Sequence, residues 1–280
     1  MEVQMALDIP SAYNATGVHL TECAKKNNYL CPQDFSFRKT RPATFSYFDM
    51  AIRYKNRFYA IFMDIRHNDS SIIPDFSERK EKFIKFCQGN NLVPCIFPLD
   101  MSFGKHNGPH GYGTYFSGGY GILQIFTPCN KESWNLFHAV TGDPVEPSKG
   151  ATDELTPMSE YEKYYFATDV AKKIVEEKYG KIVEWYDVLP GNDPQLIYIN
   201  KHHNTKEWCC VRVVDKPISE LTESEVAQAT KNMHIFNPIF SHNGLFFLIY
   251  IEKSEDRTAP GYHYKYKIEE SFRTPYEIID

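Results

Sequence analysis

The chain of 280 residues lacks several features that mark well-defined classes of protein. No stretch approaches the roughly 20 consecutive apolar residues that a membrane-spanning helix needs. The longest apolar run, Gly244–Ile251, has only the length of a strand. No hydrophobic segment follows a positively charged one near the N-terminus, so we expect a cytoplasmic protein with neither a secretion signal nor a membrane span.

Paired cysteines and excess positive charge are also missing. The seven cysteines are scattered and form no Cys-x-x-Cys pair, which argues against a structural zinc site and against a disulfide framework. The formal net charge is −5, which counts against strong, sequence-independent binding of nucleic acid but leaves room for a local basic cleft. Apolar residues make up 42% of the chain and aromatic residues 15%, so the composition is that of a folded protein.

The most informative feature of the sequence is an internal similarity between its two halves. In each half, a helical pattern leads to a pair of strand-like runs joined by a turn. The distance from Asp49 to Asp64 equals the distance from Gln195 to Cys210, and an arginine follows two residues later in both halves. The shared order and spacing favour a duplication.

The similarity continues downstream of Arg66 and Arg212. A helical pattern over 77–91 precedes a strand at 92–97, and a helix over 222–233 precedes a strand at 234–240. Thr222 and Glu225 form a capping-box signature at the start of the second of these helices. We therefore predict two helix–strand–strand–helix–strand units, spanning 1–147 and 148–280, with a polar linker within 146–160.

Two acids stand inside the apolar hairpin of the first unit. Asp49 lies on its first strand and Asp64 on its second. Two carboxylates on neighbouring strands can face the same side and bind a hard cation such as Mg²⁺ or Mn²⁺ through oxygen ligands. Such a cation would polarise a phosphodiester and activate a bound water. The alternative is that both acids are ordinary hairpin residues, exposed or paired with nearby arginines.

This arrangement resembles the PD-(D/E)XK (restriction-endonuclease-like) nuclease superfamily, whose signature is an acid on one strand followed by an acid and a lysine on the next. The resemblance covers roughly residues 15–100 and, in eroded form, 158–252. It implies catalytic roles for Asp49, Asp64 and Arg66, with Arg66 in the place of the lysine, and adds Glu22 as a helix-borne metal ligand. Arg66 departs from the pattern, because arginine can hold a phosphate but stays protonated and cannot act as a base.

The second unit departs further from the same pattern. Gln195 and Cys210 occupy the two acid positions, and neither is a good ligand for Mg²⁺. We interpret this unit as a degenerate copy in which Arg212 contacts either a phosphate or a nearby carboxylate. The adjacent Cys209 and Cys210 fit a buried strand, where core packing is the default.

A glycine-rich, aromatic stretch at 110–119 forms an insertion in the first unit. Its segment around Tyr112 and Tyr115 is similar to the Gly-x-Tyr-Phe segment of ADP-ribosyltransferases, which implies a less favoured alternative activity. Tyr112 and Tyr115 could equally stack on the bases of single-stranded nucleic acid.

From these observations we expect an α/β fold built from two restriction-endonuclease-like units, each a mixed sheet flanked by helices. The function that the resemblance implies is a divalent-metal-dependent phosphodiesterase acting on nucleic acid. The competing interpretation is a non-catalytic protein that keeps the nuclease fold for binding nucleic acid or a protein partner. The sequence leaves the choice between an enzyme and a binding protein open.

Overall fold

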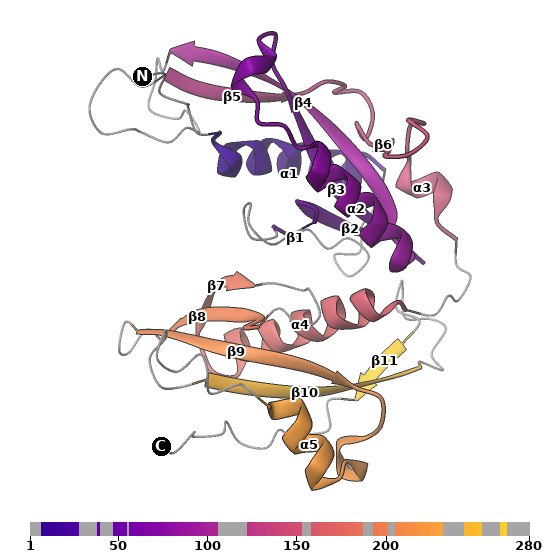
Figure 1. Ribbon diagram of the computed structural model, residues 1–280, viewed down its shortest axis with the longest axis vertical. Coiled ribbons are helices and arrows are strands. Elements are labelled where there is room, and N and C mark those ends of the chain that lie inside the picture. Colours follow the sequence, from indigo (N-terminus) through magenta and orange to yellow (C-terminus); the bar gives the residue numbers. More distant parts are fainter. Residues whose placement is uncertain are drawn as a thin grey trace. The chain divides into compact units, whose positions relative to one another are not determined.

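The computed structural model describes residues 7–27, 38–39, 47–54, 56–105, 122–152, 158–186, 193–200, 205–231, 244–253 and 264–267. The chain forms two compact units, Met1–Glu154 and Leu155–Asp280. The division falls inside the linker predicted at 146–160, a few residues beyond the boundary expected after 147. Each unit is described separately below (Figure 1).

The first unit is a mixed sheet with helices on both faces. Its strand order is β1-β2-β3-β4-β5, and β6 also pairs with β4. Only the β3–β4 pair is parallel, and α2 connects these two strands. The elements are α1 (Ile9–Lys26), β1 (Arg38–Lys39), β2 (Met50–Tyr54), β3 (Arg57–Arg66), the 3₁₀ turn η1 (Ser70–Ile72), α2 (Ser77–Gly89), β4 (Val93–Lys105), β5 (Ile122–Pro128), β6 (Phe137–His138) and α3 (Pro147–Gly150).

The second unit is also a mixed sheet, with the order β11-β10-β9-β8-β7. Among the described strands of this unit, only β9 and β10 are parallel, and α5 lies between them in the chain. Its elements are α4 (Glu160–Glu177), β7 (Ile182–Tyr186), β8 (Leu196–Asn200), β9 (Thr205–Val214), the 3₁₀ turn η2 (Ile218–Glu220), α5 (Glu223–Thr230), β10 (Gly244–Lys253) and β11 (Tyr264–Lys267).

Both units therefore follow one topology, a helix followed by three antiparallel strands, a crossover helix, a parallel strand and a final antiparallel strand. This supports the duplication inferred from the sequence. The mixed α/β class is confirmed, whereas the likeness of each unit to a restriction endonuclease stays a prediction. The crossover strand of the second unit is β10, and the strand predicted at 234–240 lies outside the described residues.

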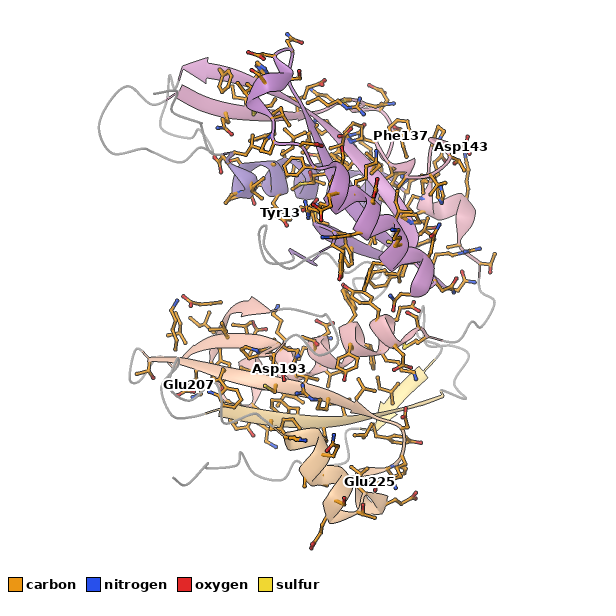
Figure 2. All side chains as sticks on the ribbon, viewed as in Figure 1. Tyr13, Phe137, Asp143, Asp193, Glu207 and Glu225 are labelled. Carbon is orange, nitrogen blue, oxygen red and sulfur yellow. The ribbon has the colours of Figure 1, made fainter. Side chains whose placement is uncertain are left out.

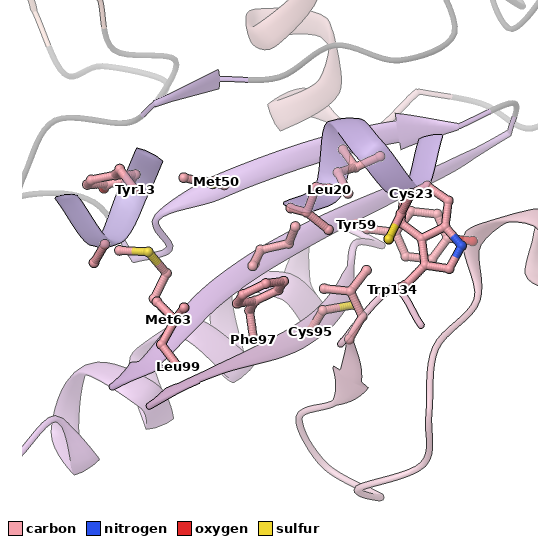
Figure 3. Close-up of a cluster of buried hydrophobic side chains, with 14 of the residues drawn as sticks. Tyr13, Leu20, Cys23, Met50, Tyr59, Met63, Cys95, Phe97, Leu99 and Trp134 are labelled. Carbon is pink, nitrogen blue, oxygen red and sulfur yellow. The ribbon is translucent and has the colours of Figure 1, made fainter. Parts of the chain in front are cut away.

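Helices cover opposite faces of each sheet, as Figure 1 shows. In the first unit, α1 buries Leu20 and Cys23 against strand residues that include Met63 and Phe97 (Figure 3). The neighbouring strand residue Phe62 points to the other face, where its ring lies 5.6 Å from that of Phe83 in α2. This alternation along β3 follows from the two-residue period of a strand.

The second unit repeats this layering. Its helix α4 packs on strand residues that include Cys209 and Val211, and Ala229 of α5 packs with Trp208 and Cys210 on the other side. The capping box predicted for Thr222 and Glu225 is present at the start of α5. Cys209 and Cys210 are both fully buried, which confirms their prediction as core residues.

Candidate functional site

Asp49 sits immediately before β2 and is almost completely buried, with 3% of its surface exposed. The backbone N–H of Met63 donates to its Oδ2 over 2.7 Å, and Nη2 of Arg79 donates to its Oδ1 over 2.5 Å. Both carboxylate oxygens therefore have a protein donor. A buried carboxylate is tolerated only when it is paired and hydrogen-bonded in this way.

Asp64 and Arg66 lie two residues apart on β3 and form a local ion pair. Nε and Nη2 of Arg66 both donate to Oδ2 of Asp64, over 2.8 and 2.7 Å. The side chains are 56% and 35% exposed for Arg66 and Asp64, so the pair adds little to stability. Its effect is to fix the guanidinium beside the carboxylate at the end of the strand.

Asp49 and Asp64 lie on the same face of the first sheet, as expected. Met50 pairs with Ile61, which places Asp49 opposite Phe62, and Asp64 is the next residue along β3 on that face. Such diagonal neighbours in an antiparallel pair are about 7–8 Å apart. Arg79 fills the space beside Asp49, with its guanidinium 4.7 Å from the centre of the Phe62 ring.

Glu22, the third ligand that the nuclease resemblance implies, lies elsewhere. It is an exposed residue of α1, and α1 covers the face of the sheet opposite to the one that carries Asp49 and Asp64. The structure thus does not bring the three acids together. Among the described residues, no group of three or more His, Cys, Asp or Glu side chains is placed to hold a metal ion.

The second unit places an amide where the first has its buried acid. Gln195 immediately precedes β8, and the N–H of Val211 donates to its Oε1 over 2.7 Å. Its Nε2 donates to Asp193 Oδ1 over 2.8 Å. Asp49 and Gln195 therefore accept the same kind of backbone hydrogen bond from the adjacent strand, and an amide serves this purpose as well as a carboxylate does.

Arg212 forms an ion pair with Asp193, the residue that also accepts from Gln195. Nη1 donates to Asp193 Oδ1 over 2.6 Å, and Nη2 donates to Asp193 Oδ2, which makes a two-pronged ion pair. The side chains of Arg212 and Asp193 are 17% and 18% exposed (Figure 2 labels Asp193 at the start of β8). Of the two partners expected for Arg212, the structure gives it the carboxylate.

The strand register corrects one equivalence between the units. Met50 pairs with Ile61 and Leu196 with Cys209, so Asp64 aligns with Arg212 and not with Cys210. The equal spacing in the sequence was misleading because the second hairpin is longer. Tyr54 pairs with Arg57, whereas Asn200 pairs with Thr205, which adds two residues to the connection.

Arg79 was not identified from the sequence as a partner of Asp49. The Arg79 side chain is only 25% exposed because it reaches Asp49. The available signal was position, since Arg79 precedes the fully buried Phe83 by four residues and so shares its helix face. Tyr112 and Tyr115 lie outside the described residues.

A cavity of about 430 Å³ adjoins this site, and Asp64, Arg66 and Lys80 line it together with part of the segment 129–142. Cys129 is also a lining residue. Cys129 is exposed, but partial desolvation, followed by a hydrogen bond to Asp100, raises the pKa of its thiol to about 11. The thiol is therefore protonated near neutral pH and is a poor nucleophile or metal ligand there.

No helix among the described residues is long and apolar enough to cross a membrane. Comparisons with models of protein families, with curated proteins and with solved structures found no match for this chain.

Proposed function

We propose that this protein is a nucleic-acid-binding protein that keeps a nuclease-like arrangement of strands without metal-dependent catalysis. In this account Asp49 stabilises the sheet instead of holding a metal ion. In the second unit, Gln195 stabilises the sheet in the same way.

The proposal rests on the hydrogen bonds of the Asp49 carboxylate. One oxygen accepts from the backbone N–H of Met63, and the other accepts from the guanidinium of Arg79. A divalent cation would need at least one of these oxygens, and binding it would place a second positive charge next to the Arg79 guanidinium. The cost of that repulsion is large in a buried setting, where charges are weakly screened. The equivalent use of Gln195, which has no charge, supports a structural purpose for this position.

Nucleic acid is the partner that the resemblance implies, and the pair formed by Asp64 and Arg66 suits it. Both donors of Arg66 that bond to Asp64 use the single oxygen Oδ2, so the guanidinium keeps its Nη1 edge for a phosphate. Tyr112 and Tyr115 of the glycine-rich stretch remain candidates for stacking on bases.

The test is binding of a fluorescent single-stranded oligonucleotide in EDTA and again with Mg²⁺ or Mn²⁺, with cleavage followed on a gel. The proposal predicts saturable binding that is equal with and without the metal, and no cleavage. Replacing Tyr112 and Tyr115 with alanine should weaken binding by roughly 1–3 kcal/mol for each stack that is lost. Absence of binding under all conditions would contradict the proposal.

One observation favours the second candidate, a metal-dependent phosphodiesterase. Asp49 and Asp64 share a sheet face, and Lys80 lines a cavity together with Asp64 and Arg66. If the protein is a phosphodiesterase, metal-dependent cleavage of the oligonucleotide should be measurable and should be lost in Asp49→Asn. Arg66→Lys should then increase cleavage, because it restores the residue that the nuclease pattern has at this position.

A further inference from the structure

The cavity beside α2 is a site in its own right. More than half of its lining residues come from the segment 129–142, which lies outside the stretch that resembles a nuclease. Asp49 is not among its lining residues. Its volume of about 430 Å³ lies in the range of roughly 300–1,000 Å³ that is typical of small-molecule sites.

Two cationic residues from two elements line this cavity, namely Arg66 of β3 and Lys80 of α2. Its acid is Asp64, which is already bonded to Arg66. Among the described residues, no carboxylate lies within ion-pairing distance of Lys80, whereas Lys82 on the same helix pairs with Glu78 over 2.6 Å. The cavity therefore holds a lysine whose charge is not balanced by a described acid.

His138 also adjoins the cavity, but its side chain lies on the other face of the sheet, because it pairs with Cys95 and alternates with Phe137. The donors for a ligand are therefore Arg66 and Lys80. Two cations of this kind, supplied by separate elements, are suited to an oxyanion.

The remaining lining is apolar in part and includes Ile96, Pro98 and Phe137. Phe137 pairs with Ile96 in the β4–β6 ladder, which places the two side chains together, and its ring is partly buried (Figure 2 labels Phe137). A wall of this kind stabilises a flat, apolar body, because an aromatic face gains from stacking. The cavity is therefore suited to a molecule with an anionic end and a ring.

We infer that this cavity binds a small phosphorylated molecule that carries a planar ring, of the class of the nucleoside monophosphates. The phosphate contacts Lys80 and Arg66, and the ring lies against Phe137. The site shares Arg66 with the proposed polynucleotide contact, whereas Lys80 and Phe137 belong to the cavity alone, so binding of AMP can be measured without any oligonucleotide and succeeds or fails independently of it.

The experiment is isothermal titration of the full-length chain, in the absence of divalent metal, with AMP, adenosine and inorganic phosphate as separate probes. AMP should bind more tightly than either fragment, because it alone contacts both the cations and the apolar wall. Saturable binding of AMP should also raise the melting temperature. No saturable binding of AMP up to roughly 1 mM, or inorganic phosphate binding as tightly as AMP, would overturn the inference.

Matched lysine variants of α2 provide the control. Lys80→Ala should weaken AMP binding by about tenfold, as expected for the loss of a charge-assisted contact, and should leave adenosine binding unchanged. Lys82→Ala removes the same charge from the same helix outside the cavity and should leave both affinities unchanged. Phe137→Leu should weaken AMP and adenosine but not inorganic phosphate. Equal loss of AMP affinity in the two lysine variants would show a diffuse charge effect and would overturn the site.

Discussion

The guanidinium of Arg79, on the crossover helix, donates to the carboxylate of Asp49 at the start of β2 over 2.5 Å. This contact joins α2 to the neighbouring sheet at the point where the sequence suggested a metal ligand. A buried carboxylate that is paired with an arginine and accepts a backbone N–H contributes to the stability of the fold, because removing either partner leaves a buried charge uncompensated. The first predictions follow from this relationship.

Substitution of Asp49 should destabilise the first unit in two steps. Asp49→Asn keeps an acceptor for the Met63 N–H but removes the ion pair, whereas Asp49→Ala removes both and leaves Arg79 without its carboxylate. We expect Asp49→Ala to lower the free energy of unfolding by about 3 kcal/mol and Asp49→Asn by about half as much. Urea denaturation checks this, with Asp64→Asn as the control at a partly exposed acid. Equal effects of Asp49→Ala and Asp64→Asn would contradict the structural role of Asp49.

Gln195→Glu should destabilise the second unit even though it restores the acid that the nuclease pattern has here. The Gln195 Nε2 donates to Asp193, so the substitution places two carboxylates in contact. Proximity of Asp193 and burial both raise the pKa of the new carboxyl group. The loss relative to the natural chain should therefore be full at pH 8 and should shrink as the pH falls toward about 4, measured as the difference in melting temperature. An unchanged difference across this range would be inconsistent with repulsion by Asp193.

Arg212 should matter for stability and not for nucleic-acid affinity, because Asp193 occupies both of its terminal nitrogens. Arg212→Lys cannot reproduce the two-pronged contact and should lower the free energy of unfolding by about 1–3 kcal/mol. The oligonucleotide affinity of the folded variant should equal that of the natural chain, measured at a temperature well below the melting transition. A loss of affinity without a loss of stability would instead indicate a contact with phosphate.

His19 should make the first unit sensitive to acid. Burial lowers its pKa from the ordinary value of 6.5, against an opposing effect of the hydrogen bond to the Ser133 carbonyl. As the pH falls below 6.5, the unfolded chain binds a proton that the buried ring does not, so stability is lost by up to about 1.4 kcal/mol per pH unit. Melting curves between pH 7.5 and 5.5 should show this loss, and His19→Gln should reduce it. A slope identical in the natural chain and in His19→Gln would contradict the assignment.

The sequence predicted the layout of this protein better than its site. Hydrophobic periodicity identified the helix and the hairpin that open each half, and Thr222 with Glu225 marked the start of α5, because these patterns act locally along the chain. The duplication was also visible, since the order of elements repeats in both halves. The exact alignment of the halves was not, because it depends on the length of one turn, and two extra residues between β8 and β9 shift Cys210 away from Asp64.

The site required contacts between distant parts of the chain. The residues around Asp49 do not tell whether its carboxylate binds a metal ion or an arginine. Its partner, Arg79, follows 30 residues later in the chain. Glu22 was placed by its order along the chain, which does not tell which face of the sheet a helix covers. The cavity was also not predictable, because its lining combines β3, α2, β4 and the segment 129–142.

The most direct test of the account is the effect of divalent metal on the melting temperature of the natural chain, Asp49→Asn and Asp64→Asn. With Mg²⁺ or Mn²⁺ at up to about 10 mM, which reaches the range of weak sites, all three should show the same small change as with an equal ionic strength of KCl. The account predicts this because both oxygens of Asp49 already have protein donors. A rise of several degrees in the natural chain that disappears in Asp49→Asn would contradict it, since only a metal bound by the folded state through that carboxylate would produce such a pattern.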